Sequence, residues 1–295
     1  MNKSILLIGS NGQVGTELQN TLSSNYKVIA VARPQIDLTQ ADNLRQIIRE
    51  TQPEIIVNAA AYTAVDKAEI EPELADAINA TAPQIIAEES QKLGSFLIHI
   101  STDYVFNGNS NYPYQETDIT NPLSVYVQTK LAGEIAIQKA CSQYIILRTA
   151  WVYGTYGKGN FVKTMLRVGK ERPEVRVVAD QIGTPTWSKD IALTITQLIP
   201  QLTAEIAGIY HYTNSGVASW YDFAIAIFEE AEKLGFPLKI NQVIPITTPE
   251  YPTPAKRPAY SILACEKISK ILGTHPPHWR QRLILMLKEL KEQSL

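Results

Sequence analysis

The chain has little cysteine, no long apolar run and no block of like charge. Its two cysteines, Cys141 and Cys265, form neither a C-x-x-C motif nor a metal-binding spacing, so we expect reduced thiols and no disulfide framework. No stretch approaches the roughly 20 uncharged apolar residues that a spanning helix needs. A formal net charge of -2 without a basic block argues against nucleic acid as a main partner.

The rest of the composition is that of an ordinary globular protein. Hydrophobic residues make up 45% and charged residues 19% of the 295 residues, enough to bury the core of one large or two modest domains. The first apolar run, Lys3–Ile8, begins so close to the N-terminus that we expect no processing segment before it. We therefore expect a cytoplasmic protein without a membrane span.

A glycine-rich segment follows this first run directly and reads Gly9-Ser10-Asn11-Gly12-Gln13-Val14-Gly15. A strand, a glycine turn and a helix in this order hold a dinucleotide pyrophosphate at the positive N-terminus of the helix. Gly9 permits the tight turn, Gly12 allows the phosphates to approach the backbone, and Gly15 allows close packing of the helix on the strand. The segment predicts a dinucleotide site that includes Asn11, Gln13 and Val14.

Apolar runs rich in β-formers alternate with helical stretches along the chain. These runs are Lys27–Ala32, Ile55–Ala60, Phe96–Ile100, Tyr144–Thr149, Val175–Ala179 and Gly208–Thr213. The alternation predicts an α/β fold, a Rossmann-like doubly wound parallel sheet with helices on both faces. We expect residues 1–155, with about 175–215, to form the dinucleotide-binding domain. We expect about 156–174 and 216–295, which include a proline-rich segment, to form a smaller C-terminal substrate-binding lobe.

The residues after the second and third strands bear on the cofactor. NAD enzymes usually place an acidic residue after the second strand, whereas arginine suits the 2′-phosphate of NADP. Ala32 and Arg33 occupy that place, which favours NADPH and leaves NADH as an alternative. Asp37 and Leu38, slightly further on, are candidates to pack beside the adenine. The small residues Ala59-Ala60-Ala61, followed by Tyr62 and Thr63, are expected to leave space for the pyrophosphate and the nicotinamide ribose.

Tyr126 and Lys130 lie four residues apart, so on a helix they share one face. The Lys130 ammonium is expected to lie near the Tyr126 hydroxyl and, together with an oxidised nicotinamide, to lower its pKa from about 10 toward neutrality. Such a phenol can exchange a proton with a carbonyl substrate. Ser101-Thr102-Asp103-Tyr104 precedes the pair after a long polar loop, and Thr102 adds a hydroxyl to the predicted site.

Taken together, these motifs resemble the extended short-chain dehydrogenase/reductase family of nucleotide-sugar enzymes. The resemblance rests on Gly9–Gly15, Asn58–Ala61, Ser101–Phe106 and Tyr126–Lys130. Further segments resemble the family's reductases of nucleotide-linked keto sugars: Val57–Lys67, Ala68-Glu69, Arg148–Tyr153, Asn160–Leu166, Asp180–Thr186 and Tyr251–Pro258. The matching segments extend from residue 5 to about residue 263.

The resemblance implies reduction of the C4 carbonyl of a dTDP-linked 4-dehydro-6-deoxy sugar by NADPH or NADH. Hydride delivery creates an alkoxide, so the site needs a proton donor and a second hydrogen bond on the same oxygen. Tyr126 would donate the proton and Thr102 would hold the oxygen. Lys130 would bind the nicotinamide ribose and tune Tyr126, and Ile100 would be a further cofactor contact.

The resemblance also implies substrate contacts. Trp151 would lie beside the sugar, and Asp103 with Tyr104 would contact the ligand from the loop below Thr102. Arg257 would bind the diphosphate through its two-pronged guanidinium. Asn160 and Lys163 are candidates for the same group.

Several points stay open at the level of sequence. Tyr62 stands where some relatives carry histidine. Some family members dimerise around Mg²⁺ held by surface glutamates, which leaves a homodimer and a Mg²⁺ site as alternatives, with Glu17 as the candidate ligand. The same pattern occurs in a non-catalytic, NADP-binding regulatory subunit of methionine adenosyltransferase. An epimerase or dehydratase that recycles bound NAD⁺ is a third reading, which the missing acidic residue after the second strand disfavours.

Overall fold

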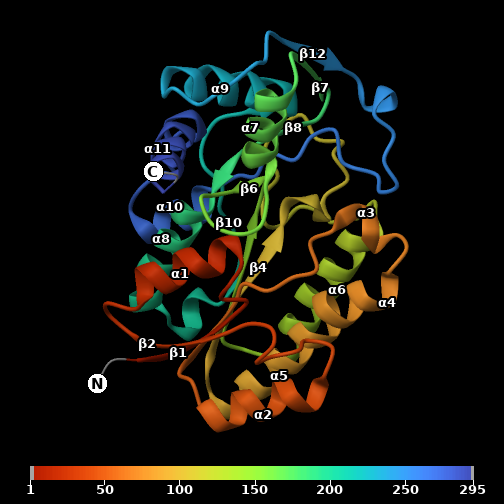
Figure 1. The fold of residues 1–295 in the computed structure, drawn as a ribbon. Helices are drawn as coiled ribbons and strands as arrows, with labels where there is room; N and C mark the ends of the chain where they lie inside the picture. Colours follow the sequence, from red (N-terminus) through yellow and green to blue (C-terminus); the bar gives the residue numbers. More distant parts are fainter. Residues whose placement is uncertain (1–2, 294–295) are drawn as a thin grey trace.

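The computed structural model describes residues 3–293, and its centre is a sheet of six parallel strands (Figure 1). The strand order is β10-β5-β4-β3-β1-β2. The strands are β1 (Ser4–Ile8), β2 (Lys27–Val31), β3 (Ile55–Asn58), β4 (Phe96–Thr102), β5 (Tyr144–Thr149) and β10 (Gly208–His211). Five of the predicted apolar runs beyond the first contribute to this sheet, which confirms the predicted fold class.

The sheet is covered by helices on both faces because its strands are apolar on both sides. On β1, Ile5 and Leu7 face one layer, whereas Leu6 and Ile8 face the other. The first layer contains α1 (Gln13–Leu22), α8 (Ser188–Leu198) and α10 (Glu266–Leu272). The second contains α2 (Ala41–Thr51), α5 (Ala82–Leu93) and α6 (Val125–Ala140), and Figure 1 shows the two layers on opposite sides.

The direction in which the chain adds strands reverses at β1. From β1 the chain moves outward to β2 and then returns to add β3 on the opposite side of β1. The connections on the two sides therefore diverge and leave a crevice beyond the carboxyl ends of β1 and β3, which is where open parallel sheets bind ligands. This topology determines where the functional residues can meet.

A second apolar cluster lies above the sheet and is rich in aromatic residues. Phe223, Trp279 and Tyr153 pack together there, with ring centroids of Phe223 5.3 Å from Tyr153 and 5.7 Å from Trp279. Its helices are α7 (Phe161–Glu171), α9 (Trp220–Lys233) and α11 (Trp279–Glu292). We call this cluster, together with these three helices and the short strands described in the next paragraph, the upper layer.

One predicted strand of the main sheet belongs elsewhere. The run Val175–Ala179 corresponds to β7 (Glu174–Val178), which pairs in parallel with β12 (Gln242–Ile246) in a separate two-stranded sheet of the upper layer. The division into domains by residue range stays a prediction. Two further short sheets pair β6 (Val152–Tyr153) with β9 (Thr186–Trp187), and β8 (Ile182–Gly183) with β11 (Ala218–Ser219).

The remaining elements are short helices. They are α3 (Val65–Ala68), α4 (Pro72–Asp76), the π-helix η1 (Ala77–Thr81) and the 3-10 helices η2 (Asp103–Val105), η3 (Ile199–Gln201), η4 (Ala204–Ile206) and η5 (Thr248–Glu250). Within residues 3–293, no helix combines the length and apolarity that a membrane crossing requires.

Candidate active site

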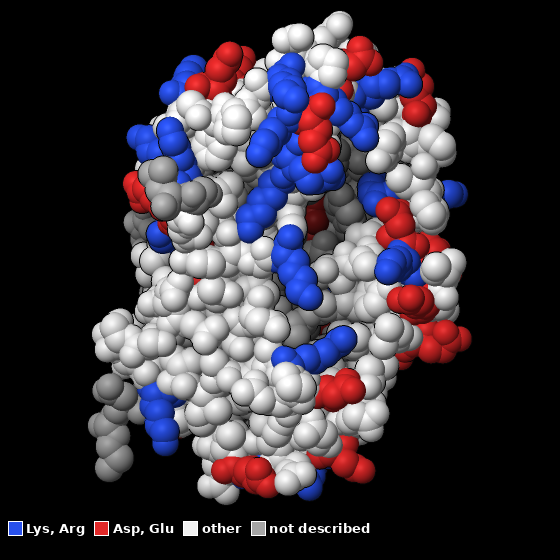
Figure 2. Space-filling model, viewed as in Figure 1, with Lys and Arg blue, Asp and Glu red and all other residues white. Residues whose placement is uncertain are grey.

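A cleft of about 810 Å³ opens between the carboxyl ends of the sheet strands and the upper layer. This volume is typical of sites for small molecules and cofactors. Figure 2 shows Lys and Arg side chains gathered around a hollow in the middle of this face, and the lining of the cleft includes Arg33, Lys158 and Arg257. A cationic rim of this kind suits an anionic ligand.

The glycine turn forms the floor of the cleft at the start of α1. Gly9 has φ +85°, and a Cβ there would lie 2.7 Å from the Ala60 backbone nitrogen. A Cβ on Gly15 would lie 2.1 Å from the Gly9 carbonyl oxygen, so a side chain cannot fit between helix and strand. Gly12 is the N-cap of α1 and lines the cleft, whereas Gly15 does not. The backbone amides at this helix N-terminus are therefore open to a ligand.

Tyr126 and Lys130 both face the cleft from the first turns of α6. Lys130 is buried, and its Nζ lies 2.8 Å from the Ile100 carbonyl oxygen and 3.3 Å from His99 Nε2. Thr102 ends β4, and its hydroxyl donates to Asp103 Oδ1 at 3.1 Å. The structure thus brings Thr102, Tyr126 and Lys130 to one wall of the cleft.

The direction of the Tyr126 pKa differs from the sequence-based expectation. Burial and the nearby Asp103 carboxylate raise the pKa of Tyr126 to about 12, and the Thr102 hydroxyl offsets part of this rise. The Lys130 amine contacts a carbonyl and an imidazole of β4 rather than the phenol. In the chain alone, Lys130 therefore does not lower the Tyr126 pKa, and the lowering expected with an oxidised nicotinamide stays a prediction. Tyr126 is held as the neutral phenol, the form that donates a proton.

Two more groups beside Tyr126 titrate unusually. Burial lowers the pKa of Lys130 to about 8, although the Glu134 carboxylate opposes this shift. Burial also raises the pKa of the Asp103 carboxyl to about 7, with smaller opposing effects from hydroxyl groups that include Thr102. Perturbed groups gathered in one cleft are typical of a catalytic site.

Trp151 forms the upper wall of the cleft together with Trp220. The two indoles stack with centroids 3.5 Å apart and planes 5° from parallel. Trp151 has φ 44°, and a Cβ on Gly183 would lie 2.4 Å from its ring, so Gly183 makes room for this indole. Thr149 also lines the cleft, and its Oγ1 is buried without a hydrogen-bond partner within residues 3–293.

A buried ion pair supports this wall from behind. Glu134, one turn after Lys130, accepts from Arg148 Nη2 at 2.6 Å and from Arg148 Nε at 3.1 Å. The Ser101 hydroxyl donates to the same carboxylate at 2.5 Å. Both charged side chains are almost completely buried, so α6, β4 and β5 are joined directly beneath the catalytic candidates.

Some predicted site residues lie outside the lining of the cleft. Asp37 accepts from its own neighbour Thr39 and does not line the space expected for the adenine. The Tyr62 hydroxyl donates to the Glu71 carboxylate. The Lys163 ammonium donates to the carbonyl oxygen of Gly157 at 3.0 Å.

Asn160 and Arg257 occupy supporting positions. Asn160 donates to Gln13 Oε1 at 2.8 Å and caps α7, so it joins the loop before α7 to the start of α1. Arg257 lines the cleft and forms an ion pair with Asp66 at 2.8 Å.

The other predicted contacts line the cleft. They are Gly9, Asn11, Gly12, Gln13, Val14, Arg33, Leu38, Ala59, Ala60, Ala61, Thr63, Ile100, Thr102, Asp103, Tyr104, Tyr126, Lys130, Trp151 and Arg257. Their functional roles stay predictions.

Sequence reasoning missed several residues of the lining. The lining also contains Ala32, Ile36, Val65, Ile78, Ser101, Thr149, Val152, Gly157, Lys158, Gly159 and Trp220. Gly157-Lys158-Gly159 carried a usable signal, because binding residues are often on loops and a loop lysine can contact an anionic ligand. Trp220 had none, since it reaches Trp151 only through the packing of α9.

The surroundings of Glu17 do not fit a Mg²⁺ site. Burial raises the pKa of Glu17 to about 7, and the nearby charges are Glu289, Lys189 and Asp190. The Lys189 ammonium already pairs with Glu289 at 2.7 Å. Within the described residues no group of three or more His, Cys, Asp or Glu could hold a metal ion. The structure gives no support to the metal alternative.

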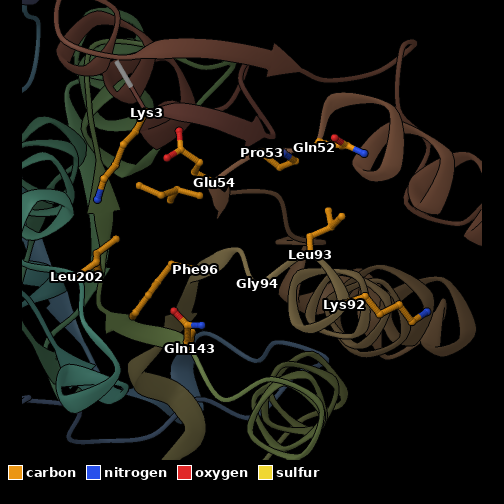
Figure 3. Close-up of a pocket in the computed structure, with 11 residues that line it drawn as sticks. Lys3, Gln52, Pro53, Glu54, Lys92, Leu93, Gly94, Phe96, Gln143 and Leu202 are labelled. Carbon is orange, nitrogen blue, oxygen red and sulfur yellow. The ribbon is translucent and has the colours of Figure 1, made fainter. Parts of the chain in front are cut away.

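A second hollow of about 530 Å³ lies at the opposite, amino edge of the sheet. Figure 3 shows its lining, which includes Lys3, Glu54, Lys92 and Gln143 from the ends and turns of several elements. Glu54 there accepts from the Ser4 backbone amide, so its polar groups serve the local backbone. None of the predicted site residues lines this second hollow.

Comparison with known proteins gives a consistent set of matches. The model of the RmlD substrate binding domain matches residues 2–292. The dTDP-4-dehydrorhamnose reductase of Escherichia coli K12 is 46% identical over 293 residues, with 97% of each chain covered. The structure of the Bacillus anthracis dTDP-4-dehydrorhamnose reductase in complex with NADP aligns with a TM-score of 0.91 at 40% identity, covering 98% of this chain and 100% of the other. A Clostridium acetobutylicum dTDP-4-dehydrorhamnose reductase aligns with a TM-score of 0.90 at 38% identity, covering 98% and 99%.

Proposed function

Because the chain belongs to the RmlD substrate binding domain family, we propose that it is a dTDP-4-dehydrorhamnose reductase. It reduces the C4 carbonyl of dTDP-4-dehydro-6-deoxy-L-mannose to give dTDP-L-rhamnose, with NADPH as the reductant and NADH as an alternative. Full-length relatives with this name, at 40–46% identity, support the reaction. The observation that carries the proposal is the meeting of Thr102, Tyr126 and Lys130 in one cleft that begins at a glycine turn.

The cofactor half of the cleft fits NADPH. The glycine turn is closed to any side chain at Gly9 and Gly15, which leaves the N-terminus of α1 open to a pyrophosphate. Arg33 lines the cleft just after β2, where its guanidinium can pair with a 2′-phosphate. When bound, the cofactor supplies the hydride. The NADP in the Bacillus anthracis relative supports this choice.

The residues of the chain provide the proton and stabilise the negative charge on O4. Tyr126 stays a neutral phenol over the physiological range, because burial and Asp103 hold its pKa high. It therefore carries the proton that the developing alkoxide at O4 accepts. Thr102 donates a hydrogen bond to the same oxygen. Lys130 holds the nicotinamide ribose and, as an ammonium, stabilises the phenolate that the transfer leaves.

The substrate half of the cleft selects a nucleotide sugar. Trp151 offers an apolar surface to the sugar ring. Asp103 and Tyr104 border the same space, and Arg257, which lines the cleft, would bind the diphosphate. Asn160 and Lys163 act indirectly, by fixing the loop that carries Lys158.

A coupled assay tests the proposal. Purified protein with dTDP-4-dehydro-6-deoxy-L-mannose should oxidise one NADPH per product formed, and NADH in parallel measures the preference. Tyr126→Phe should lower kcat by about 10² or more, as expected for loss of a general acid. Tyr112→Phe is the matched control, because Tyr112 is exposed and does not line the cleft. A non-catalytic binding protein would oxidise no NADPH, and an epimerase would show no net consumption.

A further inference from the structure

A buried chain of polar contacts runs behind Lys130 from β3 to α6. The Ala60 amide donates to Asn58 Oδ1 at 3.1 Å, and Asn58 Nδ2 lies 3.1 Å from His99 Nδ1. The other imidazole nitrogen, Nε2, lies 3.3 Å from Lys130 Nζ. Asn58, His99 and Lys130 are each at most 1% exposed, so water does not compete for these contacts.

The direction of each hydrogen bond in this chain follows from its first donor. A backbone N–H can only donate, so the Asn58 oxygen faces Ala60 and the Asn58 amide nitrogen faces His99. That nitrogen also can only donate, so His99 Nδ1 must accept. A neutral imidazole with an accepting Nδ1 carries its proton on Nε2. The Nε2–H group of His99 therefore points toward the Lys130 nitrogen.

Because of this polarity, the two protonation states of Lys130 differ in the hydrogen bonds that they can make with His99. A neutral amine accepts from His99 Nε2–H through its lone pair and still donates to the Ile100 carbonyl. An ammonium has no lone pair, so it presents a donor to a donor. Burial lowers the pKa of His99 well below its usual range, and the charge of Lys130 adds to this shift, so the imidazole stays neutral.

Other charged groups surround Lys130 from each packed element. Glu134 on α6 favours the ammonium, and Arg148 on β5 neutralises part of that effect through its ion pair with Glu134. Asp103 on η2 acts on the adjacent Tyr126. Burial of Lys130 is the largest influence and lowers its pKa to about 8. The imidazole contact acts in the same direction as burial.

We propose that Asn58 and His99 are positioning residues of the reductase: the Asn58 amide orients the His99 imidazole, whose Nε2–H holds Lys130 at the Ile100 carbonyl and opposes its protonation. This inference rests on the proposed function. The ammonium is the form of Lys130 that supports proton transfer by Tyr126. The pair therefore sets the pH at which the reductase loses activity on the alkaline side.

Asn58→Asp tests the inference with almost no change in shape. A carboxylate accepts from both the Ala60 amide and His99 Nδ1–H, so Nε2 becomes an acceptor for the Lys130 ammonium. A hydrogen bond gained by a charged group moves a pKa by one unit or more. The alkaline limb of kcat should shift upward by about one pH unit, while the KM for the sugar nucleotide changes little.

Asn79→Asp is the matched control for added charge. Asn79 is equally buried and packs beside α6, but its amide bonds Tyr62 and Thr129 rather than His99. An equal upward shift of the alkaline limb in both variants would show that the added negative charge alone stabilises the Lys130 ammonium, and it would overturn the proposal. An unchanged limb in folded Asn58→Asp would also overturn it.

NMR provides a second test that does not depend on turnover. In ¹⁵N-histidine-labelled wild-type protein, His99 should carry its proton on Nε2, whereas Nδ1 protonation would overturn the proposal. In protein with ¹³C-labelled lysine, Lys130 should titrate at lower pH in the wild type than in Asn58→Asp. Identical titration in the two proteins would also count against it. If wild-type protein consumes no NADPH, the proposed function fails, and the two NMR measurements still decide the role of Asn58 and His99.

Discussion

Glu134→Gln should destabilise the fold strongly, although the substitution keeps the size of the side chain. Glu134 accepts from Arg148 Nη2 at 2.6 Å, from Arg148 Nε at 3.1 Å and from the Ser101 hydroxyl at 2.5 Å. Arg148 is only 3% exposed, so an amide in place of the carboxylate leaves its positive charge buried and uncompensated. Loss of one partner of a buried ion pair costs about 3–5 kcal/mol. We expect a loss in that range for the free energy of unfolding.

Urea unfolding at pH 7 measures this loss as a lower midpoint with an unchanged slope. Glu171→Gln is the control, because the Arg167–Glu171 pair is more than half exposed on each side and should contribute at most about 0.5 kcal/mol. A loss below about 1 kcal/mol for Glu134→Gln would refute the reasoning, since it would show that the buried guanidinium does not need this carboxylate.

The same variant should change the pH dependence of the reaction. The Glu134 carboxylate raises the pKa of Lys130 against the larger effect of burial. Its removal should therefore lower the Lys130 pKa and shift the alkaline limb of kcat downward. Rates measured from pH 6 to pH 9 in the folded variant give this shift, and an upward shift would contradict the assigned role of Glu134.

Three further predictions concern the cleft. Gly15→Ala should destabilise the protein by about 1–3 kcal/mol and weaken NADPH binding, because its Cβ would lie 2.1 Å from the Gly9 carbonyl oxygen. Urea unfolding measures the stability and fluorescence titration the affinity, and wild-type affinity for NADPH would contradict this prediction. Arg33→Ala should raise the KM for NADPH about tenfold and leave the KM for NADH unchanged. A tenfold change corresponds to about 1.4 kcal/mol, a modest value for the loss of an arginine–phosphate contact. Equal changes for both cofactors would reject a contact between Arg33 and the 2′-phosphate. Asp103 has a pKa raised to about 7 in the folded protein, so the contribution of its carboxyl to the stability of the wild type falls as pH rises from about 4 to about 7. Asp103→Asn should remove this contribution, which amounts to a gain of up to about 4 kcal/mol at pH 8 relative to pH 4. Parallel stability curves of the two proteins from pH 4 to pH 8 would contradict a raised Asp103 pKa.

The parts of the structure set by local chemistry were accessible from the sequence. The glycine turn depends on steric limits at Gly9 and Gly15, and the shared face of Tyr126 and Lys130 follows from the geometry of a single helix turn. The parallel sheet followed from alternating apolar runs, because strands buried on both faces need apolar residues at every position. These predictions required only neighbours in the chain or one residue type in a repeated pattern.

The parts set by distant contacts were not accessible. An apolar run does not show which strand it pairs with, so the sequence predicts Val175–Ala179 in the main sheet, although β7 pairs with β12. The direction of the Tyr126 pKa depends on burial beneath the upper layer and on Asp103, which the spacing to Lys130 does not reveal. Asp37 was a plausible adenine contact, but its carboxylate is used locally by Thr39.

The main sheet and the upper layer are interleaved along the chain. The edge strand β10 pairs with β5 only after α7 and β7 of the upper layer have passed, and α10 returns to the sheet between β12 and α11. No single cut can separate the two parts. A laboratory exchange of the upper layer between related proteins would need several junctions, and a nascent chain emerging from the ribosome cannot complete its main sheet until α7 and β7 of the upper layer have also been synthesised.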